Sequence, residues 1–202
     1  MTLYAFKPRF QALLRPLTGR LAAAGVTANQ VTVAAAAGSV LLGAVLAWRG
    51  EAAPAVFLLL PAWLLLRMAL NAVDGMLARE HGQRSRLGAL LNEIGDVVSD
   101  AALYAPFALL APFGAAGIGS VVLLSVLSEF SGVLGPAIGA SRRYDGPFGK
   151  SDRALLFSAL GLWSGLAGGL PGWLWPLPGL LSCLLLLTVI RRARAALAEN
   201  PT

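Results

Sequence analysis

Two short segments of the chain place carboxylate, carboxamide and small side chains at helical spacing. The first segment runs from Asn71 to Arg79, and the second, separated from it by eight residues, runs from Gly88 to Asp100. Both lie in strongly hydrophobic surroundings, where a polar side chain is costly and is usually present for function. The sequence therefore predicts that these two segments form the active site.

The polar side chains of each segment recur three or four residues apart and so share one face of a helix. Their oxygen atoms are the ligands that hard divalent cations prefer, and such cations bind diphosphates. We therefore expect a Mg²⁺ or Mn²⁺ site that serves a diphosphate compound. The candidate ligands are Asn71, Asp74, Asn92 and Asp96, with Glu93 and Asp100 as supplementary ligands.

Two features of these segments have alternative interpretations. Asp100 either adds negative charge to the metal site or forms an ion pair with Arg67 or another buried cation. The small residues Gly75, Ala78 and Gly88 either leave room for a ligand to approach the backbone or allow close helix packing, which is common in membranes.

The composition indicates an integral membrane protein. The chain has 202 residues, of which 57% are hydrophobic and 13% are charged, and its mean hydropathy is +0.71. Soluble domains carry about 25% charged residues. The apolar runs approach the length that a membrane-spanning helix needs, and they lack the two-residue alternation of a barrel. We predict an all-α protein with six transmembrane helices at about 30–48, 53–73, 89–111, 115–140, 154–169 and 173–190.

The basic residues predict the orientation of these helices. Of the sixteen Lys and Arg residues, fourteen lie before the first span, after the second, after the fourth or after the sixth. By the positive-inside rule we expect both termini, the two longer loops and the active site to face the cytoplasm. We expect the membrane to be a bacterial inner membrane. The net charge of +6 is therefore a topology signal, and we expect membrane lipids but no nucleic acid as partners.

The first 27 residues contain no acidic side chain and predict an amphipathic surface helix. Thr27 or Asn29 is the expected N-cap of the first span, with a contact to the substrate as the alternative role of this segment. The chain thus divides into a juxtamembrane helix at 1–27, a six-helix catalytic domain at 28–194 and a cytoplasmic tail at 195–202. The apolar positions of the surface helix are Phe6, Phe10, Leu13, Leu14, Leu17 and Leu21.

The pattern of the two polar segments resembles the signature of the CDP-alcohol phosphotransferases, D-x2-D-G-x2-A-R-x8-G-x3-D-x3-D. This chain reads N-x2-D-G-x2-A-R-x8-G-x3-N-x3-D, with Asn71 and Asn92 at the first and third acidic positions. The similarity extends to the six spans, the surface helix and the T-A-N-Q-V-T segment that enters the first span. The matching positions are Asp74, Gly75, Ala78, Arg79, Gly88 and Asp96.

The resemblance implies transfer of a phosphatidyl group from CDP-diacylglycerol to the hydroxyl of a polar alcohol, with release of CMP. In that family the acidic positions hold one or two metal ions on the diphosphate, and the last, here Asp96, is the proposed catalytic base. Gly75, Ala78, Arg79 and Gly88 would line the site of the CDP moiety. Because Asn71 and Asn92 carry no charge, we expect weaker or single-metal binding.

A cytoplasmic loop at 141–153 is the candidate site for the acceptor alcohol. Its four cations, Arg142, Arg143, Lys150 and Arg153, would attract a phosphorylated acceptor such as glycerol phosphate or inositol phosphate. The alternative is that they are positive-inside charge in contact with lipid headgroups.

Two further features concern helix packing. Glu129, inside the fourth span, is a candidate partner of Arg67. Gly161-x3-Gly165-x3-Gly169 favours close packing, either between helices of the chain or in a homodimer.

Two other functions fit a polar cluster in membrane helices. One is a non-catalytic relative that binds lipid or nucleotide, and the other is a small transporter. The polar residues gather at one membrane face and no inverted repeat is visible, which favours the enzyme.

Overall fold

The computed structural model describes residues 7–199, and within that range the chain is helical with no strand. Phe6 and the last three residues of the expected tail lie outside the described range. The α-helices are α1 (Lys7–Ala23), α2 (Ala28–Arg49), α3 (Leu59–Glu80), α4 (Arg86–Tyr104), α5 (Gly114–Val133), α6 (Lys150–Ala167) and α7 (Leu177–Ala198). Short 3-10 helices are η2 (Pro54–Leu58), η3 (Ala105–Leu109), η4 (Gly135–Ile138) and η5 (Gly172–Leu174).

The chain divides into two compact units. The first comprises residues up to 41 together with 62–99, and the second comprises 42–61 together with the residues from 100 onward. The boundaries therefore fall inside α2, α3 and α4. All residues of the candidate signature belong to the first unit.

In the first unit, apolar side chains of α1 pack against the start of α2 and the end of α3. Leu14 and Leu21 contact a buried cluster that includes Val31 and Leu77. On the other side of α1, Leu13 is 76% exposed and Leu17 is 48% exposed. The apolar residues of α1 thus lie on two faces, one packed within the unit and one exposed.

The entry to α2 is fixed by two side chains. The Thr27 hydroxyl accepts a hydrogen bond from the Gln30 amide (3.2 Å), and the Gln30 side chain accepts one from the Thr27 amide (2.9 Å). This reciprocal pair is a capping box, so the N-cap prediction is confirmed for Thr27. Gln83, from the loop after α3, also accepts a hydrogen bond from the Ala28 amide (2.7 Å). The first turn of α2 is therefore tied to the α3–α4 loop.

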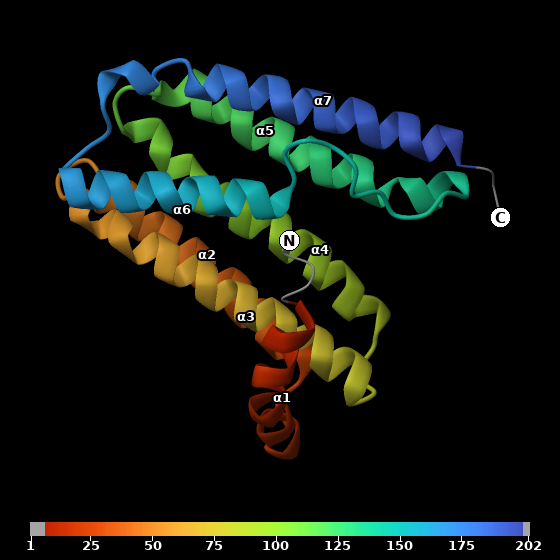
Figure 1. Cartoon of the computed structure of the whole chain (residues 1–202). Helices are drawn as coiled ribbons and strands as arrows, with labels where there is room; N and C mark the ends of the chain where they lie inside the picture. Colours follow the sequence, from red (N-terminus) through yellow and green to blue (C-terminus); the bar gives the residue numbers. More distant parts are fainter. Residues whose placement is uncertain (1–6, 200–202) are drawn as a thin grey trace. The chain divides into compact units, whose positions relative to one another are not determined.

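In the second unit, α5 and α7 lie side by side (Figure 1). Tyr104, Phe107 and Phe157 form its aromatic core: the Tyr104 and Phe157 rings stack at 4.0 Å, and Phe107 meets Phe157 edge-on at 5.0 Å. Gly161 and Gly165 of α6 pack against η2, since a Cβ at either position would meet Phe57, Leu58 or Leu60 at 2.5–3.4 Å. These two glycines serve packing within the chain, so they no longer support a homodimer.

Four helical segments of the described range are long and apolar enough to cross a membrane: Ala28–Arg49, Pro54–Glu80, Gly114–Val133 and Gly172–Ala198. They correspond to four of the six expected spans. The other two, expected at 89–111 and 154–169, fall on α4 and α6, which are helical but carry too many ionisable residues to qualify by composition. The expected span at 115–140 also ends earlier, because α5 stops at Val133 and a 3-10 turn follows.

Candidate active site

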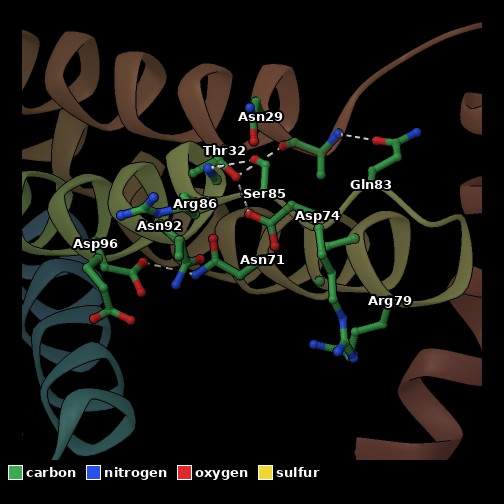
Figure 2. Close-up of a pocket in the computed structure, with 17 residues that line it drawn as sticks. Asn29, Thr32, Asn71, Asp74, Arg79, Gln83, Ser85, Arg86, Asn92 and Asp96 are labelled. Carbon is green, nitrogen blue, oxygen red and sulfur yellow. Dashed lines mark hydrogen bonds between the residues drawn. The ribbon is translucent and has the colours of Figure 1, made fainter. Parts of the chain in front are cut away.

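A pocket of about 880 Å³ lies in the first unit, between the start of α2, the second half of α3 and the first half of α4. Figure 2 shows its polar side chains. All eight positions of the signature line it, together with several residues that we did not expect. The lining residues are Ala28, Asn29, Thr32, Asn71, Asp74, Gly75, Ala78, Arg79, Gln83, Arg84, Ser85, Arg86, Gly88, Ala89, Asn92, Glu93 and Asp96.

The turn between α3 and α4 brings the two halves of the signature together. Gly82 takes a left-handed conformation (φ 68°), which favours glycine and lets the chain reverse after α3. The Ser85 hydroxyl then accepts a hydrogen bond from the Gly88 amide (2.9 Å) and caps the start of α4. A short loop joins the end of α3 to the start of α4. The polar residues near the end of α3 therefore lie opposite those in the first half of α4.

Asp74 is buried, with 5% of its surface exposed. The Thr32 hydroxyl donates a hydrogen bond of 2.7 Å to its Oδ2 atom. Thr32 lies one turn into α2, so the T-A-N-Q-V-T segment that we assigned to helix capping also contributes side chains to the pocket. A hydroxyl donor stabilises the ionised carboxylate and fixes its orientation.

The Asp96 side chain accepts hydrogen bonds from α3. Its Oδ1 atom accepts one from Arg67 Nη2 (3.0 Å) and one from Asn71 Nδ2 (3.2 Å), the latter drawn in Figure 2. Arg67 Nη2 also donates to the backbone oxygen of Asp96 (3.1 Å). The guanidinium is buried, since 4% of the side chain is exposed, whereas 21% of the Asp96 side chain remains accessible.

The small residues of the signature serve both of the roles considered. A Cβ at Gly88 would lie 2.7 Å from Asn29 Oδ1, and a Cβ at Gly75 would lie 3.0 Å from the Arg79 guanidinium. The two glycines therefore let these side chains approach the backbone closely. Gly75, Ala78 and Gly88 also line the pocket, so the same absence of side chains keeps it open.

Sequence reasoning missed the cations of the α3–α4 loop. Arg84 and Arg86 line the pocket beside Arg79, although their positions had been attributed to membrane topology. Arg84 and Arg86 lie in the sequence between Arg79 and Gly88, which are both positions of the signature. This location was the available signal, because a short loop that joins two parts of a site lies close to that site.

A family model, described as CDP-alcohol phosphatidyltransferase, matches residues 25–188. The chain belongs to the CDP-alcohol phosphatidyltransferase family. The match spans the pocket and most of the second unit, and it confirms the resemblance found in the sequence.

Comparisons with individual proteins agree with this assignment. The chain is 50% identical over 200 residues to the inner membrane protein YnbA of Escherichia coli K12, covering 98% of this chain and 97% of that protein. Its fold is similar to crystal structures of the phosphatidylinositol phosphate synthase PgsA1 of Mycobacterium tuberculosis. With CDP-DAG bound, that enzyme superposes with a TM-score of 0.74 at 19% identity, covering 91% of this chain and 92% of the enzyme. Its complex with manganese and citrate gives the same TM-score and identity, with 91% and 88% covered.

The donor set of this family member suits a hard divalent cation. In the described part of the chain no three His, Cys, Asp or Glu side chains lie close enough together to hold a metal ion by themselves. The pocket instead combines carboxylates with the carboxamides of Asn71 and Asn92. Mg²⁺ is commonly held by one or two carboxylates together with substrate phosphates and water, so these residues fit it.

Asp100 belongs to a different cluster, in the second unit. Arg153 is fully buried, and its Nη2 atom lies 3.2 Å from Asp100 Oδ2 and 2.9 Å from Glu129 Oε1. Arg192 Nη1 lies 3.6 Å from the same Glu129 oxygen. Of the two interpretations of Asp100, the structure therefore favours an ion pair with a buried cation. Within this unit Glu129 contacts Arg153 and Arg192.

The position of Arg153 differs from the expected loop. Helix α6 begins at Lys150, and the Asp152 carboxylate accepts a hydrogen bond from the Gly149 amide (2.8 Å), which fixes that start. Arg153 is thus within the first turn of a helix and points into a buried ion-pair cluster. It does not belong to an accessible acceptor-binding loop.

The remaining loop cations are also in defined environments. Arg143 binds both carboxylate oxygens of Asp145 (2.9 and 3.2 Å) and contacts Glu199, which follows α7. These contacts hold the pKa of Asp145 and that of Glu199 below their usual ranges; for Glu199 the hydrogen bonds from Ser141 contribute most. The Arg142 guanidinium lies over the Tyr144 ring at 5.1 Å. Arg143 is therefore paired with two carboxylates.

Proposed function

We propose that this protein transfers the phosphatidyl group of CDP-diacylglycerol to the hydroxyl of a polar alcohol and releases CMP. The observation that carries the proposal is the pocket of the first unit, which all eight signature positions line. Family membership supports the reaction type. The similar fold of an enzyme crystallised with CDP-DAG supports the lipid donor.

We infer a division of labour among the pocket residues. Gly75, Ala78 and Gly88 leave space for the CDP moiety, and Arg79, together with Arg84 and Arg86, offers positive charge to its diphosphate. Asn71, Asp74, Asn92 and Asp96 would hold Mg²⁺ or Mn²⁺, with Glu93 nearby. When bound, the metal offsets the charge that develops on the diphosphate. The manganese complex of the mycobacterial enzyme supports a divalent cation.

Asp96 is the proposed general base. Its carboxylate accepts the proton of the alcohol as the alcohol oxygen forms a bond to the phosphorus that carries the diacylglycerol. The bond from that phosphorus to the bridging oxygen breaks, and CMP leaves with the electron pair. The hydrogen bonds from Arg67 and Asn71 fix the orientation of the Asp96 carboxylate.

The acceptor remains a polar alcohol, with a phosphorylated alcohol such as glycerol phosphate or inositol phosphate as one class. We propose that the loop cations Arg142, Arg143 and Lys150 contribute positive charge to its binding. The alternative is headgroup contact, and a comparison of phosphorylated with unphosphorylated acceptors decides between them.

We further propose the six-span topology, with α4 and α6 crossing the membrane alongside the four apolar helices. Both termini and the pocket would then face the cytoplasm, in a bacterial inner membrane. The four apolar helices and the similarity to an inner membrane protein support this setting. The domain limits proposed from the sequence, 1–27, 28–194 and 195–202, follow from the same topology.

The test is release of CMP from CDP-diacylglycerol by the purified protein, with a panel of polar alcohols. We expect alcohol-dependent release that excess chelator abolishes and that added Mg²⁺ or Mn²⁺ restores. A non-catalytic binding relative or a transporter would release no CMP with any alcohol. Release that persists in excess chelator would contradict the metal-dependent mechanism.

A further inference from the structure

Arg67 is a permanent positive charge within the candidate site. It lies one turn before Asn71 on α3, is 4% exposed, and donates to both the side chain and the backbone oxygen of Asp96. A buried arginine stays protonated in proteins. A buried charge is costly unless it is paired. Here Arg67 forms an ion pair with Asp96, the last residue of the family signature.

The two donors to Asp96 Oδ1 use the bonding capacity of that oxygen. A carboxylate oxygen offers about two lone-pair sites. Arg67 Nη2 at 3.0 Å and Asn71 Nδ2 at 3.2 Å donate to this oxygen, so they compete with a metal ion for Oδ1. An aspartate at position 71, as in the family signature, has no N–H to donate. The carboxamide of Asn71 can therefore donate to the same Asp96 oxygen as the guanidinium of Arg67, which an aspartate at position 71 could not do.

The charges in the pocket agree with this arrangement. The three carboxylates that line it, those of Asp74, Glu93 and Asp96, are matched in number by the guanidinium groups of Arg79, Arg84 and Arg86. The buried charge of Arg67 adds to this balance, so each divalent cation bound beside it increases an excess of positive charge. That excess is unfavourable at short distance in a site of low dielectric.

We propose that Arg67 takes the place of a second metal ion beside Asp96, so that the site binds a single divalent cation. The proposal rests on the proposed function, since it concerns the same metal site. It assigns Arg67 as a positioning residue and gives Asn71 a role that the aspartate of the signature could not fill.

The first test counts metal ions in the wild-type protein. Mn²⁺ is titrated into the full-length protein in detergent, and free and bound Mn²⁺ are measured by electron paramagnetic resonance. We expect one Mn²⁺ per chain with a mononuclear spectrum. Two Mn²⁺ ions with a spin-coupled spectrum would overturn the proposal and leave the proposed function intact. No bound Mn²⁺, with CMP release that resists chelator, would overturn the metal-dependent function and this proposal together.

The second test asks whether Arg67 excludes a second ion. The variant Asn71→Asp/Asn92→Asp restores the four acidic positions and keeps Arg67; a triple variant adds Arg67→Gln. We expect a second Mn²⁺ to bind at least about tenfold more tightly in the triple variant, because only there is the competing charge removed. Equal second-site affinity in the two variants would contradict the proposal.

A charge-retaining control separates the effect of charge from that of folding. Arg67→Lys in the Asn71→Asp/Asn92→Asp background keeps the cation and should bind the second Mn²⁺ as weakly as the double variant. Circular dichroism and gel filtration report the fold of each protein. If the triple variant with Arg67→Gln does not fold, two measurements still test the proposal: the number of Mn²⁺ ions bound by the wild type and the second-site affinity of the lysine variant. Tight binding of a second Mn²⁺ ion by the wild type or by the lysine variant would contradict the proposal.

Discussion

The carboxylate of Asp96 is held from one side by two donors of α3, yet part of the side chain remains accessible from the pocket. That combination is what a general base needs, since it must be oriented and must still reach its proton. Asp74, by contrast, is nearly enclosed and is oriented by Thr32. The two aspartates of the signature thus have different surroundings, which supports different roles.

At Asp96 we expect the change Asp96→Asn to reduce turnover at least about 100-fold, because the carboxamide cannot accept the proton of the alcohol. CMP release by the purified variant measures the effect, and circular dichroism reports its fold. Glu51→Gln is the matched control, since it neutralises an exposed carboxylate in the loop after α2 and should keep wild-type turnover. More than about a tenth of wild-type turnover in Asp96→Asn would refute the assignment.

At Thr32 we expect the change Thr32→Val to raise the Mn²⁺ concentration for half-saturation by about tenfold. A hydrogen bond to a charged group contributes about 1.5–3 kcal/mol, and valine keeps the volume while removing the donor to Asp74. Mn²⁺ binding is measured directly by electron paramagnetic resonance. Thr32→Ser retains the hydroxyl and should stay close to wild type; an equal loss in both variants would point to packing instead.

At the scale of elements, the meeting of α3 and α4 could be predicted and the partners of individual charges could not. Helical spacing and the shared polarity of the two segments were enough to place Asn71, Asp74 and Asp96 in one site. The partner of Arg67 depends on the rotation of each helix about its axis, which apolar periodicity determines only broadly. The loop predicted at 141–153 includes Arg153, whereas helix α6 begins three residues earlier, at Lys150.

The ion-pair cluster between α4, α5 and α6 changes the expected effect of removing Arg153. We expect Arg153→Met to lower stability by about 3–5 kcal/mol, because it leaves the carboxylates of Asp100 and Glu129 buried without this cation. The double variant Asp100→Asn/Arg153→Met should recover part of the loss. Thermal unfolding in detergent measures both. A raised acceptor KM at unchanged stability would instead return Arg153 to acceptor binding.

At the scale of the whole molecule, the topology predicts which loops are accessible from each side of the membrane. Cys183 is the single cysteine of the chain, so Cys183→Ser provides a cysteine-free background. In that background we expect Glu51→Cys to react with a membrane-impermeant maleimide in intact cells, and His81→Cys to react only after the cells are opened. Both positions are exposed, so a difference reports sidedness. The reverse pattern would invert the proposed orientation.

The pairing of Asp100 with Arg153 also constrains how the protein is made. Translocation machinery releases a helix into lipid according to its polarity, and a single Asp or Arg at the centre of a helix costs about 2.5–3.5 kcal/mol. On the six-span topology, α4 emerges carrying Asp100, and its partner follows 53 residues later. We therefore expect α4 to enter the membrane less readily before α6 is synthesised than after it. A nascent chain that stops after α5 should show less complete integration of α4 than one that extends past α6.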